Sequence, residues 1–162
     1  MKRFKQLLQH YWPLICILIV AGFLLIFRLN RDLLWDWDEC LYSVYAREMR
    51  QTGNFLTNQW NGILDFQKPP LYTWLMQIPY SFGINEFTVR ILSVIFGLGL
   101  LAAVYVFAKK YFSTIVAVTA ILLILASQTV VTYMVKASTD LGFSLFIFLG
   151  FYCWVLSFKK SR

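Results

Sequence analysis

The uncharged stretch Ile91–Phe107, ILSVIFGLGLLAAVYVF, is the clearest sign of how this chain folds, because it holds no Asp, Glu, Lys or Arg. Three further stretches share this property, namely Tyr11–Phe27, Tyr111–Val135 and Leu141–Phe158. A helix needs roughly 17–25 predominantly apolar residues to cross the hydrocarbon core of a bilayer. We therefore predict an all-α integral membrane protein with four spans, which cover residues of about 11–28, 89–108, 112–135 and 140–158.

The composition agrees with a membrane protein and excludes several other classes. Hydrophobic residues make up 59% of the chain and charged residues 14%, whereas a soluble domain has about 45–50% and about 25%. The net charge of +7 comes from basic residues that flank the apolar stretches. A nucleic-acid-binding protein would instead gather them on one soluble face, so no nucleic-acid partner is expected. The three cysteines form no CxxC pair, and no zinc site is predicted.

The flanking charges also predict the orientation of the spans. Both ends of the chain and the turn at residues 109–110 carry basic but no acidic residues, and all eight acidic residues lie in the segments on the other side. Because Lys and Arg are enriched in cytoplasmic loops, both termini are predicted to be cytoplasmic. The loop at 29–88 is then predicted to lie on the outer face of the membrane.

The outer loop at 29–88 is far longer than a simple connection between two spans, and loops of that length are often functional. We predict two amphipathic helices within it, over about 37–52 and about 69–82, that lie in the membrane interface. Gly53 would end the first helix, and Pro69-Pro70 would begin the second. Between them, Asn61-Gly62 is typical of a tight turn.

Acidic residues at the start of the first loop helix are candidates for chemistry. Asp36 and Glu39 have the spacing of a capping box, which explains both without any function. This leaves Asp38 unexplained, in a position close to the membrane surface. Asp140, at the outer end of the fourth span, is predicted to face the same side. The alternative interpretation is that Asp140 simply begins the span, because a charge at the edge of the membrane costs little free energy.

Lys68 is a candidate for phosphate binding because it directly precedes Pro69-Pro70. A residue before proline is extended, so Lys68 would point toward the start of the following helix. The positive end of a helix dipole favours phosphate at such a place. On these grounds alone, a lysine whose ammonium simply reaches the membrane interface is an equal alternative.

The order of motifs along the outer loop resembles a known family. The motifs are Asp38-Glu39-x-x-Tyr42, Ala46-Arg47-Glu48-Met49, Gly53, Asn61-Gly62, Lys68-Pro69-Pro70-Leu71, Trp74, Gly83-x-Asn85-Glu86-Phe87 and Arg90. They resemble the N-terminal part of glycosyltransferases of the dolichyl-phosphate-mannose protein mannosyltransferase type. The bacterial branch, which includes the aminoarabinose transferases that act on lipid A, is the more similar one.

This resemblance implies the N-terminal portion of a GT-C fold in the bacterial inner membrane, with an active site on the outer face. Such enzymes move a sugar from a polyprenyl-phosphate carrier to a lipid, glycan or protein acceptor. By resemblance, Asp38 would be the catalytic carboxylate, with help from Asp140. Lys68 and Tyr42 would bind the phosphate and lipid of the donor. The supporting positions would be Glu39, Arg47 and Arg90.

Three departures from the family pattern limit what the resemblance implies. Leu41 stands where members often carry Arg, and Gln67 stands where some aminoarabinose transferases carry a Glu that binds metal. No metal ligand is therefore predicted within this chain, and a divalent cation would need ligands from elsewhere. Members also have many more spans, so we expect this chain to be the first third of a longer enzyme.

Two other functions are compatible with four spans. One is a small flippase or carrier that works as an oligomer, and the other is a non-catalytic partner subunit of a larger transferase. A proton-coupled exporter needs a carboxylate within a span, and none of the four stretches contains one. A flippase without such coupling would leave the long outer loop without an obvious use.

Overall fold

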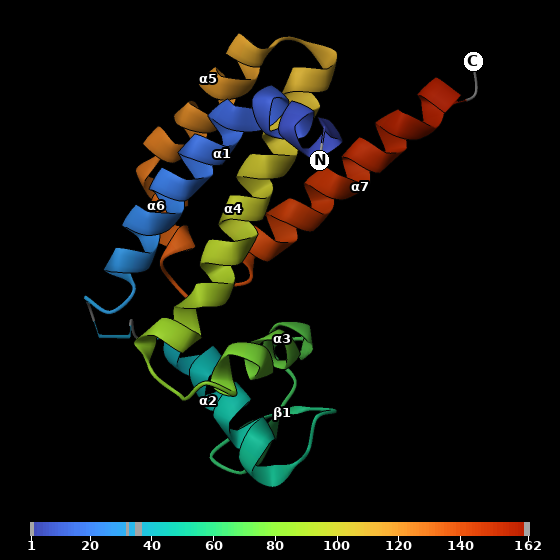
Figure 1. The fold of residues 1–162 in the computed structure, drawn as a ribbon. Helices are drawn as coiled ribbons and strands as arrows, with labels where there is room; N and C mark the ends of the chain where they lie inside the picture. The colour runs from blue at the N-terminus through green and yellow to red at the C-terminus, as the bar shows by residue number, and fades with distance from the viewer. Residues whose placement is uncertain (1, 32, 35–36, 161–162) are drawn as a thin grey trace.

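A computed structural model describes residues 2–31, 33–34 and 37–160 of the chain. The larger part is a bundle of helices α1 (Lys2–Arg28), α4 (Glu86–Tyr111), α5 (Thr114–Ala126), α6 (Gln128–Met134) and α7 (Asp140–Lys160). The smaller part lies at one end of this bundle (Figure 1). It contains α2 (Asp38–Thr52), β1 (Asn58–Trp60), β2 (Ile63–Asp65) and α3 (Leu71–Tyr80).

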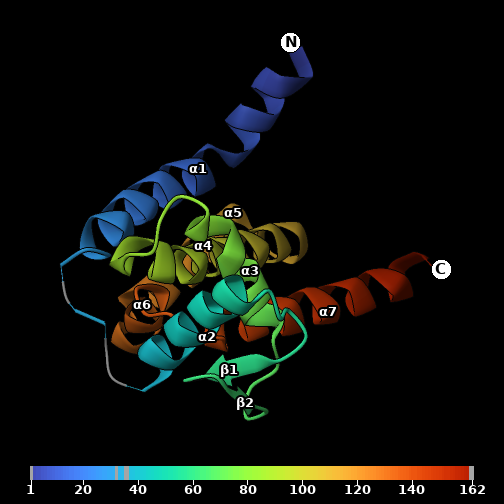
Figure 2. The same cartoon turned by 90° about the horizontal axis from the view of Figure 1, so that it is seen from below.

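Helix α4 is the centre of the arrangement. It packs against α1, α5 and α7 within the bundle and against α3 near its first turns. Figure 2 shows the same helices from below, with α2 and α3 lying across the end of the bundle. Both ends of the chain lie toward the opposite end of the bundle in Figure 1. Which of the two ends faces the cytoplasm stays a prediction.

Among the residues that the structure describes, three helical segments are long and apolar enough to cross a membrane, namely Gln9–Arg28, Glu86–Tyr111 and Asp140–Phe158. The fourth expected span, over 112–135, is a bent pair of helices that is long and apolar enough to cross a membrane only when the two helices count as one span. Helices α5 and α6 meet there at a bend of 77°, and Ser127 between them has an extended backbone (φ −73°, ψ 110°). The break falls in the polar run Ser127-Gln128-Thr129, and Ser127 is the N-cap of α6 without a side-chain capping hydrogen bond.

The smaller unit contains a feature that an all-α prediction omits. Strands β1 and β2 pair antiparallel, with Asn58 opposite Asp65 and Trp60 opposite Ile63. Asn61 (φ 51°) and Gly62 (φ 77°) join them, as the expected tight turn requires. Helix α2 ends at Gly53, which is left-handed (φ 70°). Whether α2 and α3 lie in the membrane interface stays a prediction.

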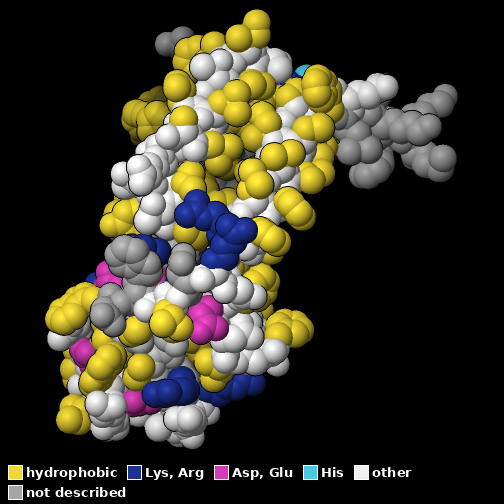
Figure 3. Space-filling view, turned by 90° about the vertical axis from the view of Figure 1, so that its left-hand side faces the viewer, with side chains coloured by type: hydrophobic (Ala, Val, Ile, Leu, Met, Phe, Trp, Pro, Cys, Tyr) yellow, Lys and Arg dark blue, Asp and Glu magenta, His cyan; other side chains and the backbone are white. Residues whose placement is uncertain are grey.

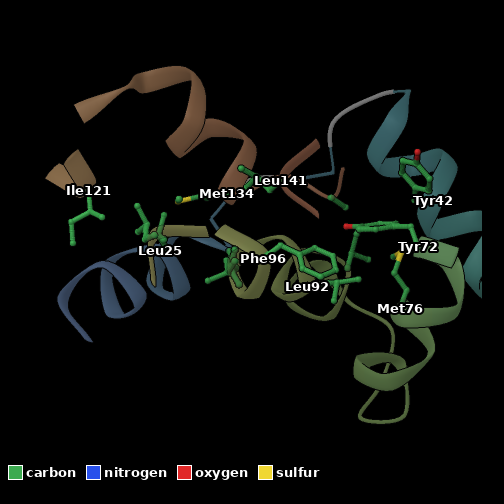
Figure 4. Packing of buried hydrophobic residues seen from close by; sticks show 14 of the residues in the cluster. Leu25, Tyr42, Tyr72, Met76, Leu92, Phe96, Ile121, Met134 and Leu141 are labelled. Atoms are coloured by element: carbon green, nitrogen blue, oxygen red, sulfur yellow. The ribbon is translucent and has the colours of Figure 1, made fainter. Parts of the chain in front are cut away.

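The apolar core is continuous between the two parts of the molecule (Figure 4). Tyr42 of α2 and Tyr72 of α3 pack edge to face, with ring centres 4.9 Å apart. Within the bundle, Met134 of α6 lies against Gly97 of α4, where an added Cβ would lie only 2.6 Å from the methionine side chain. A larger residue at position 97 would therefore push α6 away from α4.

Acidic side chains gather at one end of the molecule, whereas apolar side chains are exposed along its whole length (Figure 3). On the face in Figure 3, acidic side chains lie only over the lower part, which holds α2, α3 and the hairpin. The bundle above exposes many apolar side chains, and on α1 these include Ile19, Phe23, Leu24 and Phe27. A surface of this kind suits contact with lipid or with further helices.

Candidate active site

Asp38 and Lys68 meet at the junction between the two parts of the molecule. The Nζ atom of Lys68 lies 3.5 Å from Oδ1 of Asp38, and the two side chains are 36% and 51% exposed. The same ammonium lies 5.8 Å from the centre of the Tyr42 ring. An ion pair this exposed stabilises a fold by only about 0–1 kcal/mol. Stability therefore gives little reason for these two charges to be paired here.

The backbone around Lys68 is fixed by the hairpin. The side-chain amide of Asn58 in β1 donates a hydrogen bond of 2.8 Å to the Lys68 carbonyl. Pro70 then precedes the first turn of α3. With its backbone held in this way, Lys68 directs its side chain toward Asp38 in the first turn of α2.

The charge of Lys68 is reinforced by its surroundings. The Tyr42 hydroxyl and then the Asp38 carboxylate raise the pKa of the Lys68 ammonium above its ordinary value. Lys68 is therefore a cation throughout the neutral range. A fixed cation beside a carboxylate, near the expected depth of lipid headgroups, can bind a phosphate.

A second pair, Glu39 and Arg90, is buried beside this site. The Nε and Nη2 atoms of Arg90 donate to the two Glu39 oxygens at 2.9 and 3.0 Å. Arg90 also donates to the carbonyls of Leu29 at 2.7 Å and Leu33 at 2.8 Å. The Ala137 amide donates to Glu39 at 2.8 Å. The pair thus joins α2 and α4 to the end of α1 and to the segment before α7.

The capping box expected for Glu39 is wrong. Helix α2 has no side-chain hydrogen bond at its N-cap, which is Trp37. The buried guanidinium of Arg90 is a stronger partner for the Glu39 carboxylate than an exposed backbone amide, because both groups are charged and the bond is bidentate. The other half of the expected box, Asp36, lies outside the described residues.

The two remaining predicted residues do not join this group. Arg47 is exposed on α2, and Asp140 is exposed at the first position of α7. Within the described ranges, no contact connects either side chain to Asp38 or Lys68. Their roles stay predictions.

Glu48 is a residue whose importance sequence reasoning missed. Its two carboxylate oxygens accept the backbone N–H groups of Asn61 at 2.8 Å and of Gly62 at 3.0 Å. Glu48 of the Arg47-Glu48 motif therefore binds the Asn61-Gly62 turn directly, so that α2 holds the hairpin in place. Only their shared place in the family pattern could have suggested this. Over the part of the chain that the structure describes, no cluster of three metal-binding side chains occurs.

Two cavities open near the Asp38–Lys68 pair. A polar cleft of about 140 Å³ is lined by Trp37, Asp38, Glu39, Tyr133, Lys136, Ala137 and Ser138. An apolar groove of about 190 Å³ lies between α3, α4 and α7, and it begins at Pro69 beside Lys68 and at Thr139 beside Asp140. The site can therefore take a charged group at Lys68, an apolar chain in the groove and a polar group in the cleft.

The hairpin is also tied to α2 by Tyr45, which donates a hydrogen bond of 2.5 Å to Asp65. This bond, and then the Gln67 amide, lower the pKa of the Asp65 carboxyl. Burial and then Asp65 raise the pKa of the Tyr45 hydroxyl. At neutral pH the carboxylate is therefore the acceptor, and the tyrosine the donor.

We expect the hairpin to loosen only in acid. A carboxyl whose pKa is lowered by folding stabilises the fold above the unfolded pKa of about 3.9, and this stability is lost as pH falls through the lower folded value. Hydrogen exchange over residues 58–65, corrected for the intrinsic rate, should therefore rise below about pH 4. Asp65→Asn should make this step smaller, and a step of unchanged size in the variant would contradict the assignment.

Comparison with known proteins places this geometry in a family. Residues 67–162, more than half of the chain, match the family model described as dolichyl-phosphate-mannose-protein mannosyltransferase. The chain is 39% identical over 100 residues to an undecaprenyl phosphate-alpha-4-amino-4-deoxy-L-arabinose arabinosyl transferase of Pseudomonas savastanoi, covering 59% of this chain and 19% of that protein. An uncharacterised protein of Aquifex aeolicus is 28% identical over 148 residues, covering 90% of this chain and 30% of that one.

Solved structures show the same fold. The crystal structure of ArnT from Cupriavidus metallidurans in the apo state matches 78% of this chain with a TM-score of 0.72 and 24% identity. The structure of that protein bound to undecaprenyl phosphate matches 83% with a TM-score of 0.70 and 25% identity. The chain spans 24% of ArnT and less than a third of the two relatives above. The fold and the family match together show that the chain belongs to the dolichyl-phosphate-mannose-protein mannosyltransferase family.

Proposed function

We propose that the longest natural form of this protein is a membrane glycosyltransferase. It moves a sugar from a polyprenyl-phosphate carrier to a lipid, glycan or protein acceptor at the outer face of the membrane. The Asp38–Lys68 pair carries this proposal, because it sets a carboxylate beside a cation, and the next residue, Pro69, lines an apolar groove. The relative named for undecaprenyl phosphate-linked aminoarabinose, and the ArnT structure bound to undecaprenyl phosphate, support the choice of carrier.

The Asp38–Lys68 pair can meet two needs of the reaction, which are a cation for the carrier phosphate and a base for the acceptor. A carrier phosphate would displace Asp38 as the counterion of Lys68, since a phosphate offers more acceptor oxygens and charge. Asp38 would then be free to take the proton of the acceptor as a general base. The acceptor attacks the anomeric carbon, the bond from that carbon to the phosphate oxygen breaks, and the carrier phosphate leaves. Lys68 would stabilise the negative charge on that leaving group.

The apolar groove suits the part of the carrier tail nearest the phosphate. Its walls include Leu71, Leu75, Phe96, Phe143 and Phe146, and it starts next to the residue whose ammonium would hold the phosphate. A prenyl chain is apolar, so its burial there is favourable. Tyr42 would support the phosphate end. Asp140, one residue beyond Thr139 of the groove, would assist at the sugar or acceptor, with Glu39, Arg47 and Arg90 in supporting roles.

We expect Lys68→Ala to raise the apparent KM for the lipid-linked donor by about 10–100-fold, because hydrogen bonds to charged groups contribute about 1.5–3 kcal/mol. Steady-state transfer from undecaprenyl phosphate-linked aminoarabinose by the longest natural form measures this. Arg50→Ala, which removes an exposed cation from the same unit, should leave KM unchanged. An unchanged KM in Lys68→Ala would favour the alternative that the Lys68 ammonium only reaches the membrane interface and does not bind the donor. Absence of any transfer by the unmodified protein would favour the carrier or partner-subunit alternatives.

A further inference from the structure

The polar cleft beside Asp38 is not used by the reaction steps above. Lys68 does not line it, and its walls come from two places far apart in the chain, the start of α2 and residues 133–138 between α6 and α7. The neighbouring groove has apolar walls, whereas the residues that line this cleft carry two carboxylates, an ammonium, two hydroxyls and an indole. A lipid tail would gain little from such walls, because their polar groups would lose water without new partners.

Ser138 gives the cleft an unused hydrogen-bonding group. The residue is 4% exposed, and its hydroxyl has no hydrogen-bond partner among the residues that the structure describes. Its backbone is held by Ser93, whose Oγ accepts the Ser138 amide at 3.3 Å. A buried hydroxyl without a partner costs free energy. A ligand with its own hydroxyl or amino group in the cleft would remove that cost.

Trp37 supplies an aromatic surface at the edge of the same cleft. Its side chain is 83% exposed, and its backbone has φ 79° and ψ −104°. Positive φ is strained for a bulky residue and occurs most often at functional sites. The Trp37 carbonyl accepts the Leu41 amide at 2.8 Å, which fixes this residue at the start of α2. The backbone of Trp37 is therefore fixed next to Asp38, and the residue lines the cleft.

We propose that this cleft binds the sugar that is transferred. The ring of the sugar would stack on Trp37, and Tyr133 and Ser138 would bond to its polar substituents. Asp38 would then line the sugar cleft and also lie beside the phosphate at Lys68, within reach of an acceptor that attacks the anomeric carbon. The inference rests on the proposed function and adds the residues that select the sugar.

The test compares two ligands that differ only in the sugar. We would measure Kd for undecaprenyl phosphate and for undecaprenyl phosphate-linked 4-amino-4-deoxy-L-arabinose, using the longest natural form in lipid nanodiscs. In the double variant Tyr133→Phe, Ser138→Ala, the Kd of the sugar-bearing ligand should rise about tenfold, as expected for two lost hydrogen bonds. The Kd of the sugar-free ligand should stay within about twofold. Trp37→Ala should likewise raise the Kd of the sugar-bearing ligand and leave the Kd of the sugar-free ligand nearly unchanged.

Thr73→Ala is the matched control. Thr73 also has a buried hydroxyl without a partner among the described residues, but it lies in α3 outside the cleft, so neither Kd should change. Equal changes in both constants, or no change in either, would overturn the sugar site. Lys68→Ala, in contrast, should weaken both ligands alike. If Asp38→Asn abolishes transfer while the cleft variants bind as before, the proposed function stands and this inference fails.

Discussion

Asp38→Asn is expected to abolish sugar transfer by the longest natural form of the protein, with a fall in kcat of about 10²–10⁴-fold, the usual contribution of a general base. The amide has nearly the same shape as the carboxylate but cannot accept the proton of the acceptor. Mass spectrometry of the acceptor after incubation with the lipid-linked donor measures the loss. Expression and membrane insertion should be normal, because the side chain is half exposed and its ion pair contributes little to stability.

The binding of the donor separates this role from a structural one. Without Asp38, Lys68 loses its resident counterion and remains available to the phosphate, so the Kd for undecaprenyl phosphate should not rise. Glu86→Gln is the control, since it removes a carboxylate at the first position of α4 that the proposed site does not include, and it should keep transfer close to that of the unmodified protein. Transfer at the normal rate by Asp38→Asn would remove Asp38 from the mechanism.

Features that depend on nearby residues could be predicted from the sequence. The long apolar helices follow from stretches without charge, and the ends of α2 and β1 follow from Gly53 and Asn61-Gly62, where the backbone needs positive φ. The polar run at 127–129 was visible too. Its effect on the helix could not be judged, because membrane helices often tolerate such residues when neighbours satisfy the freed backbone groups.

Contacts between distant segments could not be predicted in the same way. Topology put Asp38 and Lys68 on one side of the membrane, but their approach depends on Asn58 and on the Glu48 contact with the hairpin turn. The partner of Glu39 lies 51 positions away, so local spacing favoured the capping box instead. Tyr133 and Ser138 reach the cleft only because the chain bends between α5 and α6 before it turns toward α7.

Arg90→Met is expected to lower the free energy of unfolding by about 3–5 kcal/mol, because it leaves the Glu39 carboxylate buried without its cation. It also leaves the carbonyls of Leu29 and Leu33 without this donor. Denaturant unfolding in detergent, followed by circular dichroism, measures the change. Arg50→Met, at an exposed position of α2, should stay within about 0.5 kcal/mol of the unmodified protein.

A double variant tests whether the loss comes from the unpaired charge. Glu39→Leu together with Arg90→Met removes both charges and should recover part of the stability, as replacement of buried ion pairs by apolar residues often does. The losses in unfolding free energy of Glu39→Leu and Arg90→Met, added together, should then exceed the loss in the double variant by at least about 1 kcal/mol. Additive losses would contradict direct coupling. Since Glu39 follows Asp38 and contacts Ala137 beside the cleft, a folded Arg90→Met protein should also transfer sugar more slowly, which links the buried pair to the geometry of the site.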